Sequence, residues 1–144
     1  MEKQSLILNT ALLPFASLIA ALGLDVTKFV ILSFLMELDL VTGTTKAYVR
    51  KEDITSRRLS AGFLSKVMVL LIPLTVAIMA KGLEVDMRWL VTFTISILIV
   101  AEAYSVVGNI YTIKTGETVK EIDAVSAIVK ALGRFLENML KGAK

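Results

Sequence analysis

Acidic side chains stand inside two of the most apolar stretches of the chain. Glu37 and Asp39 interrupt the apolar run that follows Lys28, and Glu102 opens a series of polar residues in a later run. The members of that series recur at spacings of 3, 4 and 3, which places them on one helix face; they are Glu102, Ser105, Asn109 and Thr112. A carboxylate at the centre of a bilayer costs about 2.5–3.5 kcal/mol on insertion scales, so each acid needs an ion-pair partner or water.

Two interpretations of these acids remain open. Glu37 and Asp39 are two residues apart, so they point to different faces of a helix and cannot easily share one partner. Asp39 either forms an ion pair that fixes one helix against another or meets water in an assembled channel. Glu102 has the same two options, as part of a helix–helix seam or of a wet lumen. The candidate cations are Lys46, Arg50 and Lys66 for Glu37 and Asp39, and Lys66 or Lys81 for Glu102.

Enzymatic chemistry finds little support in the residue types. The chain has no cysteine and no histidine, which removes thiolate nucleophiles, the commonest general base and the commonest metal ligand. Residues 41–46, VTGTTK, lack the spacing of a phosphate-binding loop. We therefore expect neither an enzyme nor a bound cofactor or metal.

The elements that carry these residues read as membrane spans. Of 144 residues, 56% are apolar, and the mean hydropathy is +0.74. The charged residues gather in short segments between long apolar runs, as in an all-α integral membrane protein. Gly23 is expected to end the first span and Asp25 to cap the second. The expected spans are residues 6–24, 26–48, 61–80 and 89–113, and together they form a transmembrane domain over residues 1–113.

Two features of this topology need comment. Residues 6–24 also resemble a signal peptide, but no A-x-A cleavage site follows, and we expect them to be retained as a span. With both termini inside, 13 of the 16 Lys and Arg residues lie on the cytoplasmic side, many of them in a basic loop over residues 44–60. The positive-inside rule thus predicts a multi-pass membrane protein with both termini in the cytoplasm.

The tail, residues 114–144, is too polar to span and predicts an amphipathic cytoplasmic helix. Thr118 and Glu121 have the spacing of a capping box. An apolar stripe follows at heptad spacing, at Ile122, Val125, Val129, Leu132, Leu136 and Met139. The helix could dock on its own chain, pair with other copies, or lie on the anionic inner leaflet. Nucleic acid is not an expected partner, because the tail mixes acidic with basic residues and lacks interleaved aromatics.

Self-association is expected from the spans as well. Four short spans enclose little interior, so one copy should leave its polar stripes unsatisfied. A small-residue edge at Thr94, Ala101, Ser105 and Gly108 would let another helix approach closely. The sequence therefore predicts a homo-oligomer in contact with membrane lipids.

A block of residues resembles the signature of the toxin-secretion/phage-lysis holin family. The block is LDLVTGTTKAYVRKEDITSRRLSAGFLSK, and the matching positions are Asp39, Thr42, Gly43, Lys46, Ala47, Ser56, Ser60, Gly62 and Lys66. A second block, AEAYSVVGNI, resembles the later polar stripe of the family, at Glu102, Ser105 and Asn109. The resemblance covers roughly residues 30 to 113.

The resemblance implies a small phage protein that accumulates in the inner membrane, self-associates and opens holes. A functional partner, the endolysin, then reaches the cell wall without needing direct contact; related proteins are thought to release toxins. Three alternatives stay open: a membrane adaptor that acts through its C-terminal helix, an ion or solute transporter, and a holin-like effector that depolarises its host in phage defence. A transporter would need a midplane site and usually internal repeats, and neither is visible.

Overall fold

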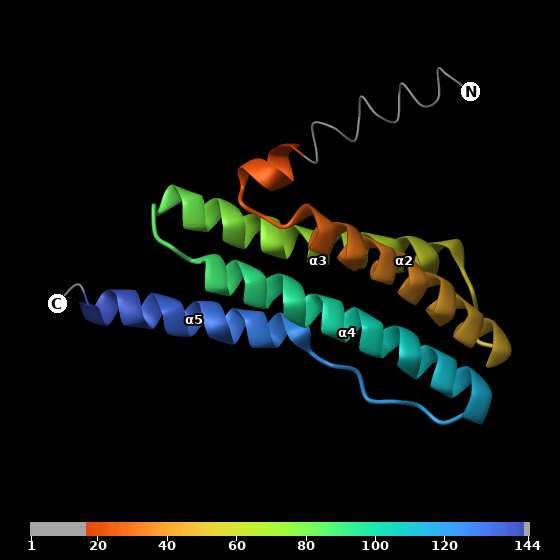
Figure 1. Cartoon of the computed structure of the whole chain (residues 1–144). Coiled ribbons are helices and arrows are strands. Elements are labelled where there is room, and N and C mark those ends of the chain that lie inside the picture. Colours follow the sequence, from red (N-terminus) through yellow and green to blue (C-terminus); the bar gives the residue numbers. More distant parts are fainter. Residues whose placement is uncertain (1–16, 143–144) are drawn as a thin grey trace, which may run out of the picture.

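The computed structural model describes residues 17–142, and all regular structure in that part of the chain is helical (Figure 1). A helical turn at residues 17–21 precedes four long helices. These are α2 (Val26–Val49), α3 (Ser56–Gly82), α4 (Arg88–Thr115) and α5 (Ala124–Gly142). Most of the expected first span, residues 6–24, lies outside the described residues.

The start of α2 follows the predicted chemistry. Gly23 adopts a φ of 74°, the left-handed conformation that glycine reaches without strain and that commonly ends a helix. The Asp25 side chain accepts hydrogen bonds from the backbone N–H groups of Thr27, at 2.9 Å, and Lys28, at 3.2 Å. Both the predicted stop at Gly23 and the predicted cap at Asp25 are confirmed.

The basic loop is much shorter than residues 44–60. Helix α2 continues to Val49 and α3 begins at Ser56, so only residues 50–55 connect them. Threonine residues are accommodated at this end of α2 because the hydroxyls of Thr44 and Thr45 donate hydrogen bonds to carbonyls one turn back, at 2.7 and 2.8 Å. Thr55 caps α3 by accepting from the Arg58 N–H at 3.2 Å. The loop prediction was wrong because polar composition was taken to mean irregular backbone.

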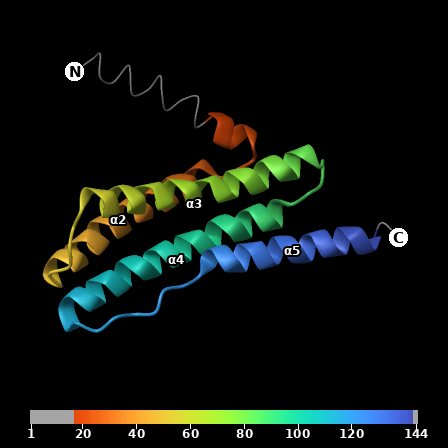
Figure 2. The same cartoon turned by 180° about the vertical axis from the view of Figure 1, so that it is seen from behind.

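The core lies between α2 and α4, which run side by side in the same direction (Figure 2). Leu32 of α2 and Leu98 of α4 are fully or almost fully buried there. Helix α3 runs antiparallel to both and contacts them less, and α5 folds back along α4. The consequence is a thin bundle whose polar residues from three helices meet in a narrow seam.

Two of the described helices, α3 and α4, are long and apolar enough to cross a membrane. They do not resemble core helices of a soluble protein, because only 17% and 33% of their most apolar stretches are buried. Large apolar side chains cover the outside of α3 instead, at Phe63, Leu64, Met68, Leu71 and Ile78. Helix α2 is more polar: every 18-residue stretch contains three charged residues, drawn from Lys28, Glu37, Asp39 and Lys46.

Helix α5 begins at Ala124 rather than at residue 118. The predicted capping box of Thr118 and Glu121 is therefore wrong, and Asp123 takes its place by accepting from the Ser126 N–H at 2.9 Å. Hydrogen bonds from Ser126 also hold the pKa of the Asp123 carboxyl below its usual range. The preceding residues, 116–123, form an irregular segment that returns along α4 (Figure 1).

The face of α5 that packs on α4 is not the predicted stripe. Ala124, Ile128 and Ala131 are buried against α4 and its neighbours. Of the stripe, only Leu132 is partly buried against this core, while the other five residues are exposed: Ile122, Val125, Val129, Leu136 and Met139. The apolar arc of α5 is wider than a heptad stripe, and one half of it docks while the other half stays open.

Candidate functional site

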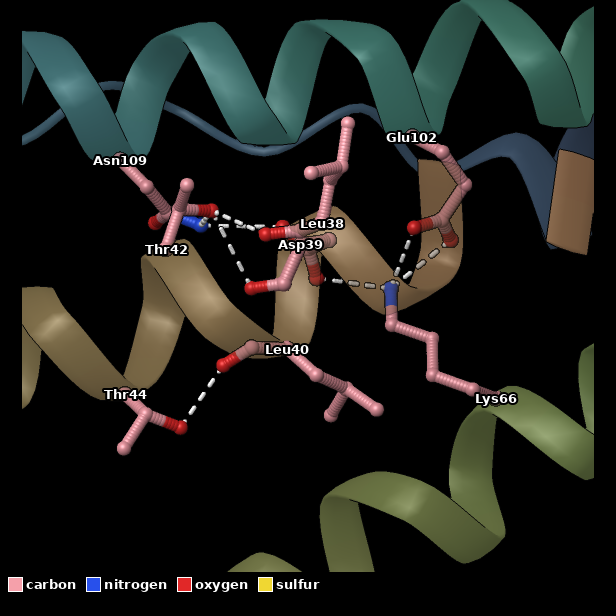
Figure 3. Close-up of polar contacts among 8 residues, drawn as sticks. All are labelled: Leu38, Asp39, Leu40, Thr42, Thr44, Lys66, Glu102 and Asn109. Atoms are coloured by element: carbon pink, nitrogen blue, oxygen red, sulfur yellow. Dashed lines mark hydrogen bonds and ion pairs between the residues drawn. The ribbon is translucent and has the colours of Figure 1, made fainter. Parts of the chain in front are cut away.

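One lysine joins two carboxylates at the centre of the bundle (Figure 3). Lys66 Nζ of α3 lies 2.8 Å from Asp39 Oδ2 of α2, and it donates to both carboxylate oxygens of Glu102 of α4, at 2.8 and 2.6 Å. The three side chains are 21%, 13% and 9% exposed for Lys66, Asp39 and Glu102. This triad ties all three helices to one point.

A second set of contacts extends the triad along α2 and α4. The Asn109 amide nitrogen donates to Asp39 Oδ1 at 2.9 Å and to Thr42 Oγ1 at 3.2 Å. The Thr42 hydroxyl donates in turn to the carbonyl of Leu38, 2.9 Å away. One oxygen of the Asp39 carboxylate therefore contacts the Lys66 ammonium, and the other accepts a hydrogen bond from the neutral Asn109 amide.

Helix periodicity explains the assembly of this polar cluster. Asp39 and Thr42 are three residues apart on α2, and Glu102 and Asn109 are seven apart on α4, so each pair lies on one helix face. Gly43 lies against α4, where a Cβ would make an ordinary contact at 3.6 Å from the Asn109 amide nitrogen. The sequence left open whether Glu102 pairs with Lys66 or Lys81, and the structure selects Lys66.

One copy satisfies this cluster by itself. Every buried side-chain nitrogen or oxygen among the described residues has a hydrogen-bond partner. The expectation that a single copy leaves its polar stripe unsatisfied is therefore wrong for Glu102 and Asn109. Its charges do not cancel, however: with all three groups ionised, the triad contains two negative charges and one positive charge. Removal of the lysine would leave both carboxylates without a cation.

Several predicted site residues lie apart from the triad. Glu37 is exposed on the outer side of α2. Thr112 is buried, but its hydroxyl donates only to the carbonyl of Gly108. Ser105 is half-buried and lines a neighbouring cavity together with Lys46.

Gly62 faces α2, where a Cβ would meet Leu40 Cδ2 at 3.5 Å. The small-residue edge is covered at Gly108 by Val119 of the returning segment.

Sequence reasoning missed an ion-pair network at the connection between α2 and α3. Glu52 lies 3.1 Å from Arg50 Nε and 2.8 Å from Arg58 Nη2. The hydrogen bond from Arg58 holds the pKa of the Glu52 carboxyl below its usual range. Two adjacent acids, Glu52 and Asp53, among so many basic residues were the available signal. No group of three carboxylates in residues 17–142 could hold a metal ion.

The family of the chain follows from a comparison with known proteins. The model of the bacteriophage holin family matches residues 16–133 of the 144. No curated protein and no solved structure matches the chain significantly. The matched segment contains all five residues of the polar cluster, Asp39, Thr42, Lys66, Glu102 and Asn109, and confirms the resemblance that the two sequence blocks indicated. With so much of its length matched, and with two exposed apolar helices able to cross a membrane, the chain belongs to the bacteriophage holin family.

Proposed function

We propose that the protein inserts in the bacterial inner membrane as a multi-pass protein, assembles with copies of itself and opens holes that release an endolysin or a toxin. Family membership supports the general role. Helix α2 lies along α4, so it passes through the same depth of the membrane wherever α4 crosses. We place the connection between α2 and α3 on the cytoplasmic side, as the positive-inside rule predicts from its basic residues.

The observation that carries self-assembly is the position of Glu37. It stands in an exposed stripe of α2 whose apolar members are Val30, Phe34 and Val41, at spacings of 4, 3 and 4 with Glu37 included. These three side chains are 61%, 58% and 62% exposed. In a single copy this stripe faces lipid, where a carboxylate costs about 2.5–3.5 kcal/mol. Contact with the α2 stripe of another copy would let the carboxylate share a partner or reach water.

Cysteine crosslinking in membranes tests this contact, because the native chain contains no cysteine. We expect Phe34→Cys and Val41→Cys to form disulfide-linked dimers upon mild oxidation. Leu71→Cys, on the exposed side of α3, is the matched control and should crosslink far less. Efficient crosslinking at Leu71 with none at either α2 position would reject the proposed interface.

Expression in bacteria with a membrane-potential dye tests hole formation itself. The protein alone should depolarise the cells, and lysis should require a co-expressed endolysin. Glu37→Leu should delay depolarisation, whereas Glu84→Gln, an exposed acid in the α3–α4 turn, should leave the timing unchanged. Correctly inserted protein that never permeabilises the membrane would contradict the proposal. If depolarisation kills the cells without an endolysin, and a co-expressed endolysin causes no lysis, the alternative of a defence effector is favoured.

The open half of α5 favours one second candidate, a membrane adaptor. Val129 and Leu140 are 61% and 70% exposed on this helix and could receive a partner protein. Deletion of residues 118–144 distinguishes the two roles. Hole formation that survives with altered timing supports the holin. Intact insertion of the full-length chain without any permeabilising activity of its own supports the adaptor.

A further inference from the structure

A cavity of about 420 Å³ lies beside the polar cluster, at the end of the bundle where α2 ends and α3 begins. Its walls come from the last turn of α2, the first half of α3, the second half of α4 and the returning segment at residues 118–122. Pockets that bind small ligands commonly occupy about 300–1,000 Å³, so the space suits a small polar group. Lys66 and Glu102 of the triad form part of its wall, but the proposed assembly makes no use of the space.

The charge of the cavity lining is predominantly positive. Five cations line it, Lys46, Arg50, Arg58, Lys66 and Lys120, against three acids, Glu52, Glu102 and Glu121. Glu52 holds both arginines, at 3.1 and 2.8 Å, and Lys66 belongs to the triad. Within residues 17–142, no carboxylate forms an ion pair with Lys46 or Lys120. Two ammonium groups are thus free to bind an anion.

The lining also supplies neutral hydrogen-bonding groups. Three hydroxyl-bearing residues line the cavity, Tyr104 and Ser105 of α4 and Thr118 of the returning segment. Two lysines with several hydroxyls suit the oxygen atoms of a phosphate group, which accepts several hydrogen bonds at once. A carboxylate ligand would use fewer of these donors.

The depth of the cavity indicates where such a group is found. Lys66 is ten residues from the start of α3, about 15 Å along the helix, and Lys46 is three residues before the end of α2. Under the proposed orientation this end faces the cytoplasm. The cavity mouth then stands at the level of the inner-leaflet headgroups, whose anionic lipids attract basic segments.

We propose that this cavity is a phosphate-binding site, in which Lys46 and Lys120 hold the anionic phosphate of a phospholipid headgroup or of a soluble phosphate ester. Lys120 belongs to the segment that joins α4 to α5, and Lys46 belongs to α2. A bound phosphate therefore bridges the tail segment to the membrane domain and fastens α5 in its docked position.

The binding experiment uses the full chain purified in a neutral detergent, with bound lipid counted by native mass spectrometry. Dioctanoyl phosphatidylglycerol is the probe, and dioctanoylglycerol, which has the same acyl chains without phosphate, is its control. We expect the phospholipid to bind at least 10-fold more tightly. Equal binding of the two compounds to the unmodified protein would overturn the proposal without any use of variants.

Substitutions locate the site. Lys46→Gln and Lys120→Gln should each weaken phosphatidylglycerol binding roughly 5-fold, and together roughly 20-fold, as expected for about one lysine contact each. Lys114→Gln is the matched control, because Lys114 is an exposed lysine in the last turn of α4 outside the cavity. Circular dichroism checks that the helices persist. A loss at Lys114 as large as that of the double variant would place binding outside the cavity and reject the proposal.

Competition distinguishes the two sources of phosphate. If the natural ligand is a lipid, millimolar glycerol 3-phosphate should leave bound phosphatidylglycerol in place. If it is a soluble ester, glycerol 3-phosphate should displace the lipid at comparable concentrations, and the double variant should lose both ligands. Binding in detergent requires no hole, so a failure here leaves the proposed holin function untouched.

Discussion

Lys66 and Glu102 lie 36 residues apart in the sequence, yet two hydrogen bonds of 2.8 and 2.6 Å join the Lys66 ammonium to the Glu102 carboxylate. The same ammonium reaches Asp39 at 2.8 Å. One cation on α3 therefore pairs with carboxylates on two other helices, so removing the lysine and removing one carboxylate have different consequences. The loss of one carboxylate leaves a neutral pair, whereas the loss of the lysine leaves two anions at the centre of an apolar bundle.

The first prediction follows from this asymmetry. Lys66→Met should lower the free energy of unfolding by about 3 kcal/mol or more, because it strands two partly buried carboxylates. Glu102→Gln should cost about 1 kcal/mol or less, because the carboxamide oxygen can still accept from Lys66. Chemical unfolding in detergent micelles measures both, with Lys141→Met at an exposed position of α5 as the control. Equal losses for Lys66→Met and Glu102→Gln would contradict the triad.

The second prediction concerns the approach of α2 to α4 at Gly43. Gly43→Ala should be neutral, or stabilise by up to about 1 kcal/mol, because the new Cβ meets Asn109 at an ordinary contact distance of 3.6 Å. Gly43→Leu should cost about 1–3 kcal/mol, because the larger side chain must displace Asn109 from Asp39. Thermal unfolding followed by circular dichroism compares them. A large loss with alanine would show that the helices lie closer than described.

The third prediction tests the docking of α5 with two neighbouring residues. Ile128 is 1% exposed and Val129 is 61% exposed. Ile128→Asp should detach α5, because it buries a carboxylate without a partner, while Val129→Asp should leave the helix docked. Hydrogen exchange over residues 116–142 provides the measurement, and we expect faster exchange only in the Ile128 variant. The same exchange in both variants would mean that α5 does not pack on α4 through this face.

The fourth prediction is a pH dependence at the connection between α2 and α3. Because Arg58 holds the pKa of Glu52 below its usual range, the folded connection favours the carboxylate form. This stabilisation is present above the ordinary glutamate pKa of about 4.3 and is lost as the pH falls through the lowered value. The protection factors of the amides in residues 50–58, which are corrected for the pH dependence of intrinsic exchange, should therefore fall as the pH drops below about 4.3. Glu52→Gln should abolish that pH dependence, and a response that persists in this variant would assign it to another group.

The sequence was sufficient for what depends on local chemistry. Gly23 and Asp25 mark the boundary between two helices because a left-handed turn and a side-chain cap act within a few residues. The polar face of α4 was also predictable, because Glu102 and Asn109 repeat at the helical period. The apolar character of α3 and α4 could be predicted from their amino-acid composition alone.

Long-range choices required the structure. Lys66 and Lys81 both lie on α3 and were equal candidates for Glu102, and only the register of α3 against α4 decides between them. The docked face of α5 was misassigned for a similar reason. Its apolar arc offers two overlapping stripes, and contact with α4 selects the one through Ala124, Ile128 and Ala131. The short connection at residues 50–55 was missed because the threonine hydroxyls near the end of α2 find acceptors within the helix, in carbonyls one turn back, so these polar residues do not end it.

Because α5 docks along α4, the molecule has one charged side and one apolar side. Along its outer edge this helix presents Lys130, Arg134, Glu137 and Lys141, all exposed, while the outside of α3 presents bare hydrocarbon. Acyl chains can close around the apolar side but not around the charged side. In the proposed assembly, any copy whose tail stays docked must therefore place this charged edge against water or against another polar surface rather than against acyl chains.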